Sequence, residues 1–109
     1  MHGAGTSQLT LRITIENSAE SVLLKLEGRV AGRWTAELEN AWSKLAPSVC
    51  GREVSIDIRG ATYVDQAGIR LLRNIYRATN AEFQTSSLLT RFMADEIKQD
   101  QVNATKEVD

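Results

Sequence analysis

Residues 54–68 have the sequence VSIDIRGATYVDQAG, and this stretch decides the fold of the chain. Apolar and polar side chains alternate from Val54 to Ile58, which is typical of a β-strand with one buried face. A short loop is expected to follow, and a helix is expected to begin around Ala67 and Gly68. A helix start after a strand exposes unpaired backbone N–H groups, and Asp65 would place a carboxylate beside them.

Asp65 lies one or two positions before the first expected helical residue. Its side chain can accept hydrogen bonds from the free N–H groups, and such a cap is worth about 0.5–2 kcal/mol. Gly68 would let the backbone pack closely or would let another molecule approach it. From chemistry alone, a capped helix and an exposed functional surface explain this segment equally well.

Two strands are predicted before this stretch, and a helix follows them. Alternation from Leu9 to Glu16 predicts the first strand, and alternation from Val22 to Leu26 predicts a second that ends at Gly28. The short link between them favours an antiparallel hairpin. The period then changes to that of an amphipathic helix, which should end before Pro47 because the residue before a proline avoids helical geometry. That helix carries Trp34, Leu38, Ala41, Trp42 and Leu45 on one face.

The two tryptophans of this first helix could line a ligand site or belong to the core. We favour the core, because tryptophans at helical spacing are usually packed inside, with the indole N–H near a helix end.

A second helix is predicted from Gln66 to Thr79, with Asn80 as its C-terminal stop. Its inner stripe should contain Ile69, Leu72, Ile75, Tyr76 and Thr79. Its arginines should form an outward basic stripe made of Arg70, Arg73 and Arg77. Such a stripe could bind an acidic partner, a phosphate or RNA, but we favour a solvated helix face.

A short strand from Glu82 to Thr85 and a third helix complete the chain. Ser86 or Ser87 can cap that helix. Its apolar face is expected to consist of Leu88, Leu89, Phe92, Met93 and Ile97.

The order β-β-α-β-α-β-α predicts an α/β, two-layer domain with a mixed four- to five-stranded sheet. Because the strands alternate, the helices should lie mainly on one face of the sheet. We expect a flexible leader at 1–8, one domain at 9–97 and a polar tail at 98–109.

Composition excludes several classes of function. With 109 residues and a net charge of −1, the chain has no general attraction for nucleic acid or acidic membranes. It has no apolar run long enough for membrane insertion and no signal-peptide pattern at its start. A lone cysteine, Cys50, fits a reducing, cytoplasmic setting. A lone histidine, His2, leaves no catalytic triad or histidine-containing metal site, so we expect no enzyme, metal or cofactor.

Taken together, these segments resemble STAS domains, the family named for sulfate transporters and anti-sigma-factor antagonists. The resemblance runs from Leu9 to Ile97 and is carried by the element order and by two motifs, LEGRV at 26–30 and IDIRGATYVD at 56–65. Ser86 and Ser87 at the start of the third helix also fit.

The resemblance implies a small protein-binding module, similar to an anti-sigma-factor antagonist in bacterial-type transcription regulation. Such modules dock an anti-sigma factor, often a serine kinase, through the loop before the second helix and through that helix. The implied partner-binding residues are Tyr63, Asp65, Gln66, Ala67, Gly68, Arg70 and Arg73. The family motif D-S-S-G carries a phosphorylated second serine, whereas this chain reads Asp65-Gln66-Ala67-Gly68.

Alanine at 67 cannot accept phosphate, so the chain resembles the unmodified, partner-binding state. The hydroxyls of Thr62, Ser86 and Ser87 are candidate substitute phosphoacceptors. Two alternatives stay open: an accessory subunit of a lipid or anion transporter complex, and a module that binds a small ligand.

Overall fold

The computed structural model describes residues 10–99 of the chain. Its elements are β1 (Leu11–Asn17), β2 (Ser21–Val30), α2 (Arg33–Leu45), the 3₁₀ turn η1 (Ala46–Ser48), β3 (Glu53–Val64), α3 (Gln66–Thr79), β4 (Glu82–Gln84) and α4 (Leu88–Lys98). The predicted order is therefore confirmed. The leader at 1–8, the strand start at Leu9 and the tail beyond residue 99 lie outside the described residues.

One four-stranded sheet has the order β1-β2-β3-β4. β1 and β2 form the predicted antiparallel hairpin, while β2 with β3 and β3 with β4 are parallel. The fold class is thus an α/β domain with a mixed sheet. β4 pairs with β3 only from Ser55 to Asp57, so β3 continues well past its short neighbour.

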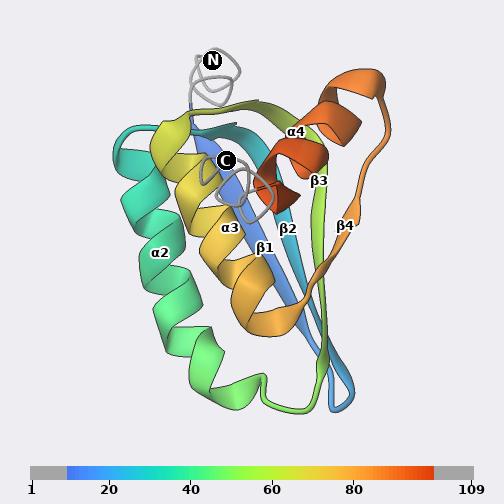
Figure 1. Cartoon of the computed structure of the whole chain (residues 1–109). Coiled ribbons are helices and arrows are strands. Elements are labelled where there is room, and N and C mark those ends of the chain that lie inside the picture. The colour runs from blue at the N-terminus through green and yellow to red at the C-terminus, as the bar shows by residue number, and fades with distance from the viewer. Residues whose placement is uncertain (1–9, 100–109) are drawn as a thin grey trace, which may run out of the picture.

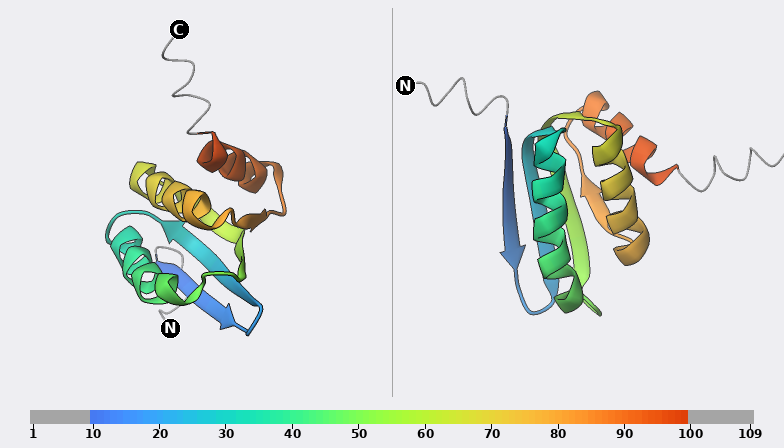
Figure 2. Two further views of the ribbon diagram at one scale, coloured as in Figure 1. Left: turned by 60° about the horizontal axis from the view of Figure 1, so that its bottom comes forward. Right: turned by 90° about the vertical axis from the view of Figure 1, so that its left-hand side faces the viewer.

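The core lies between the sheet and the helices. Figures 1 and 2 show α2 and α3 side by side over one face of the sheet, with α4 beside α3. The strands contribute alternate residues to this face, and these are buried: Val22, Leu24, Leu26, Val54, Ile56 and Ile58. Trp34 and Trp42 pack against this core while half-buried, as the core interpretation predicted.

Helix boundaries follow local chemistry. α2 gives way at Leu45 to a 3₁₀ turn that holds Pro47, as the proline predicted. α3 runs from Gln66 to Thr79, as predicted, and ends at Asn80 in the left-handed conformation (φ 57°). No helix among residues 10–99 has both the length and the apolar character that a bilayer crossing requires.

The prediction of a loop between the third strand and α3 is wrong. β3 extends to Val64, and only Asp65 separates it from α3. β2 also continues past Gly28, and pairing of its last two residues with β3 keeps both strands extended. The pairing register shifts twice along this stretch, which hides the two-residue period in the sequence.

The prediction for the third helix is wrong for three of its five apolar residues. The inward stripe of α4 consists of Thr90, Met93, Ala94 and Ile97. The other three predicted residues are exposed: Leu88 by 83%, Leu89 by 55% and Phe92 by 67%. Thr90 and Ala94 take the inward places because they complete a stripe at i, i+3, i+4 and i+7.

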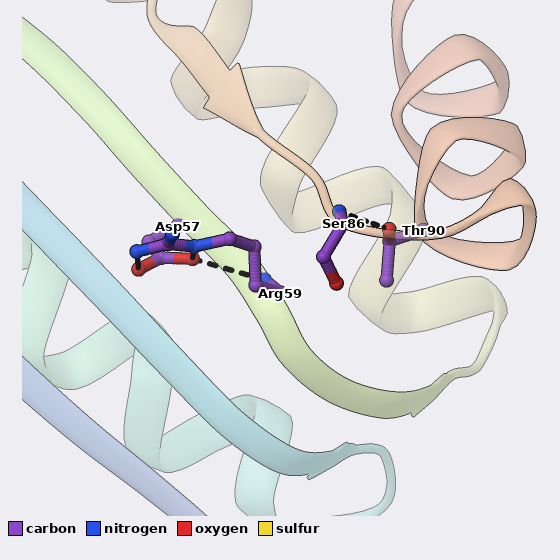
Figure 3. A network of polar contacts seen from close by, with 4 residues as sticks. All are labelled: Asp57, Arg59, Ser86 and Thr90. Carbon is purple, nitrogen blue, oxygen red and sulfur yellow. Dashed lines mark hydrogen bonds and ion pairs between the residues drawn. The ribbon is translucent and has the colours of Figure 1, made fainter.

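The other face of the sheet is polar. Asp57 projects from it, and its carboxylate accepts hydrogen bonds from Nε (3.0 Å) and Nη2 (2.9 Å) of Arg59 and from the Arg59 backbone N–H (3.0 Å). Figure 3 shows this pair in front of β3, with the helices behind the sheet. These hydrogen bonds lower the pKa of Asp57, which explains how a carboxylate only 2% exposed remains charged.

At one end of the domain, Arg52 connects η1 to the β1–β2 hairpin through hydrogen bonds. Its guanidinium donates to Ser48 O (2.8 Å) in η1, to the side chain of Asn17 at the end of β1 and to the backbone carbonyl of Ser18 in the hairpin turn. Cys50 is exposed in the same connection, just before β3 begins. This end of the domain is opposite the start of α3, because β3 runs from the Arg52 end to the end where α3 begins.

Candidate functional site

Asp65 joins two connections that are distant in sequence. Its Oδ1 accepts from the Gly68 N–H (2.8 Å), which caps α3 as predicted, and its Oδ2 accepts from the Gly32 N–H (3.0 Å) at the start of α2. Hydrogen bonds from Gly32 and Gly68 lower the pKa of this carboxyl below its ordinary value. The side chain therefore holds the two helix starts in a fixed relation.

Gly68 is buried at the point where α3 meets the sheet. A methyl group there would lie 2.7 Å from Val30 O and 2.8 Å from Val64 Cγ1. Of the two roles predicted for Gly68, the structure shows close backbone packing. The absence of a side chain at Gly68 thus lets the first turn of α3 pack directly against the ends of β2 and β3.

The tip of α3 is open to the outside. Gln66 and Ala67, in the first turn, are both exposed. Tyr63, at the end of β3, is 45% exposed, and the guanidinium of Arg29 lies 4.7 Å from its ring centroid. The fold therefore presents an aromatic ring, an amide and a methyl group close together, beside a carboxylate whose oxygens are already hydrogen-bonded.

Only part of the predicted basic stripe of α3 points outward. Arg70 is exposed and lies near enough to act electrostatically on Asp65. Arg73 is half-buried, and its guanidinium donates to Ile97 O (3.0 Å) and Glu96 O (2.9 Å) at the end of α4. The prediction that Arg73 belongs to an outward stripe is therefore wrong, because unpaired carbonyls at a helix C-terminus attract an arginine.

Replacing Arg73 by methionine is expected to loosen the last turn of α4 while leaving α3 folded. Two hydrogen bonds to the terminal carbonyls are lost, at a cost of about 1–2 kcal/mol in the free energy of unfolding. Hydrogen exchange at residues 95–98 should accelerate. Arg70→Met, at an exposed position of the same helix, is the matched control, and equal exchange in both variants would contradict this role of Arg73.

The candidate substitute phosphoacceptors fall into two groups. Thr62 is exposed on β3. Ser87 caps α4, since its Oγ accepts from the Thr90 N–H (3.2 Å), while the N–H groups of Ser86 and Ser87 donate to Thr90 Oγ1 (2.9 and 3.0 Å). The predicted capping role of this serine pair is confirmed for Ser87, and Figure 3 shows the Ser86 contact.

A groove of about 360 Å³ opens beside the tip of α3. It is lined by residues 62–66, by Ile69 of α3, and by Leu89, Phe92, Met93 and Glu96 of α4. α4 was not expected to contribute to the site, because Leu89 and Phe92 were predicted to lie on its apolar inner face. Leu89 and Phe92 each lie one position before a buried residue of α4, Thr90 or Met93. The helical spacing of the buried residues could therefore have shown that Leu89 and Phe92 lie outside the inward stripe.

Among residues 10–99, no three or more His, Cys, Asp or Glu side chains are grouped so that they could hold a metal ion. The arrangement at the tip offers contact surface and hydrogen-bonding groups.

Two solved structures are similar to this chain in the arrangement of their helices and strands. A STAS domain of an antisigma-factor antagonist from Rhodobacter sphaeroides matches with a TM-score of 0.50 at 20% identity, over 72% of this chain and 88% of that chain. The fold is that of a STAS domain. A crystal structure of Mglu matches with a TM-score of 0.54 at 19% identity, over 80% of this chain and 22% of that chain.

The STAS fold expected from the resemblance of residues 9–97 is thus confirmed. This chain spans less than a quarter of the Mglu chain, whereas it spans most of the Rhodobacter STAS domain. No protein-family model and no curated protein matches the chain. At these identities the property that this chain shares with the two structures is the fold.

Proposed function

We propose that this STAS domain is a non-catalytic, regulatory module that binds a protein partner through the tip of α3, in the manner of an anti-sigma-factor antagonist. The observation that carries the proposal is the exposure of Gln66 and Ala67 on a tip that Asp65 and Gly68 hold rigid. A rigid, exposed surface binds without a large ordering cost. The fold shared with an antisigma-factor antagonist supports this choice.

The partner would be an anti-sigma factor, of serine-kinase type or otherwise, in the control of transcription. Ala67 occupies the position at which a phosphate would disrupt such a complex, and its methyl group keeps the tip free of added charge. We infer that binding is constitutive at this position. A transporter subunit is the alternative partner, and the genes beside this one would distinguish the two.

A charge placed at position 67 is expected to separate binding from folding. The partner is first purified from the native cell on the wild-type chain and identified, and its Kd is then measured for each variant. Ala67→Asp should weaken binding by about tenfold or more through repulsion and desolvation. Its free energy of unfolding should be unchanged or higher, because an acidic residue in the first turn favours a helix.

Two further variants control this experiment. Ala67→Ser should bind within about twofold of the wild type, because its hydroxyl carries no charge. Asn74→Asp adds the same charge to an exposed position of α3 two turns from the tip, and it should also bind normally. Equal affinity for all three variants would show that the partner does not dock at the tip.

A further inference from the structure

The groove beside the α3 tip owes its existence to the shortness of β4. β4 leaves β3 after Asp57, and the chain then runs to α4 through residues 85–87. Figure 1 shows β3 and β4 diverging toward the end where α4 lies. Within residues 10–99, the last part of β3 consequently has a strand neighbour on one side only, and α4 forms the opposite wall of the groove.

The α4 wall is apolar where a surface helix would normally be polar. Leu89 and Phe92 line the groove while 55% and 67% exposed, and Leu88 extends the same patch at 83% exposure. The inward stripe of α4 is complete without these three residues, so they add nothing to the core. A contiguous apolar patch beside a groove is typical of a surface that another molecule covers.

Charge around the groove favours an acidic occupant. Arg29 lies over the ring of Tyr63, a lining residue, and Arg70 acts on Asp65, another lining residue. Both oxygens of Asp65 already accept backbone N–H groups, which leaves Glu96 as the lining carboxylate without such bonds. The starts of α2 and α3 add the positive ends of their dipoles to the same region.

We propose that the partner protein inserts large apolar side chains, flanked by carboxylates, into the groove between β3 and α4. Phe92 and Leu89 would contact the apolar anchors, and Arg70 and Arg29 would face the carboxylates. This proposal rests on the proposed docking function and extends the docking surface from the α3 tip to α4. It also assigns a role to the exposed face of α4.

A phage-displayed library of random peptides of about 12 residues, selected on the full chain, tests this chemistry directly. Selected peptides should combine aromatic or branched apolar residues with Asp or Glu nearby. A Leu89→Ser/Phe92→Ser variant should bind them at least about tenfold more weakly. Ile15→Thr removes an exposed apolar side chain from β1 and should leave binding unchanged.

Charge variants sharpen the same experiment. Arg70→Gln should weaken binding of the selected peptides several-fold, and Glu96→Gln should strengthen it, because each changes the field at the groove by one charge. Enrichment of basic peptides, absence of any enriched peptide, or equal binding by the Leu89→Ser/Phe92→Ser variant would overturn the proposal.

Two other occupants would also overturn it. A wild-type dimer in light scattering that the Leu89→Ser/Phe92→Ser variant abolishes would make the patch an interface between copies. Sedimentation of the chain with phosphatidylcholine–phosphatidylglycerol vesicles, abolished by the same variant, would make it a lipid contact. Failure here is distinguishable from failure of the docking function: a native partner that is sensitive to Ala67→Asp but indifferent to the groove variant would leave docking at the tip intact.

Discussion

Replacing Gly68 by alanine is expected to lower the free energy of unfolding by about 2–3 kcal/mol, as overpacking of a closed site does. An added methyl group would lie 2.7 Å from the carbonyl oxygen of Val30, a backbone atom that cannot turn away. Either α3 would shift from the sheet or the end of β2 would move. Urea unfolding followed by circular dichroism measures the loss.

The sign of this effect is diagnostic. At an uncrowded helical position, glycine to alanine stabilises a protein by up to about 1 kcal/mol. Ala67→Gly, the reverse change at the exposed neighbouring position, should therefore cost less than about 1 kcal/mol. A Gly68→Ala variant as stable as the wild type would show that α3 can retreat from Val30 without penalty.

Replacing Asp65 by alanine is expected to cost about 1–2 kcal/mol, the upper range for an N-cap, because the side chain also bonds the start of α2. Asp65→Asn retains one acceptor oxygen, so its stability should lie between those of alanine and the wild type. Partner affinity should fall in both variants, because Gln66 and Ala67 would lose their fixed support.

The Asp65 contribution should depend on pH in a defined direction. Hydrogen bonds from Gly32 and Gly68 lower the pKa of this carboxyl in the folded state. Its stabilisation is therefore fully present above the unfolded-state pKa of about 3.9, and it is lost as the pH falls through the lower folded-state value. The difference in unfolding free energy between wild type and Asp65→Asn should shrink below about pH 4. A difference that stays constant from neutral pH to pH 2–3 would argue against a charged cap.

Most of the fold was predictable because most of its helices and strands are determined by residues close together in the sequence. Alternation in β1 and β2, the proline after α2, and the span from Gln66 to Thr79 each depend on neighbouring residues alone. The end of β3 was not predictable in this way. Its extended form depends on pairing with Arg29 and Val30, more than thirty residues earlier, across two shifts of register.

The candidate site was predictable in its position and only partly in its composition. The identity of Asp65 and its place before the helix predicted the cap of α3. Its hydrogen bond from the Gly32 N–H was not predictable, because it depends on how the starts of α2 and α3 meet in space. Arg73 and Arg70 look alike in sequence, and only the nearby end of α4 draws Arg73 away. Leu89 and Phe92 were assigned to the apolar inner face because an apolar residue on a short helix is usually buried, but both side chains are exposed in the structure.

Cys50 gives the domain a natural anchoring point. Its thiol is exposed in the connection before β3, while the α3 tip follows the other end of that strand, about 40 Å away at the usual rise per residue. Since the chain contains one cysteine, maleimide chemistry would attach every molecule to a sensor chip or a fluorophore through the same atom. Each tethered copy would then hold its α3 tip toward the solution, in one orientation across the surface.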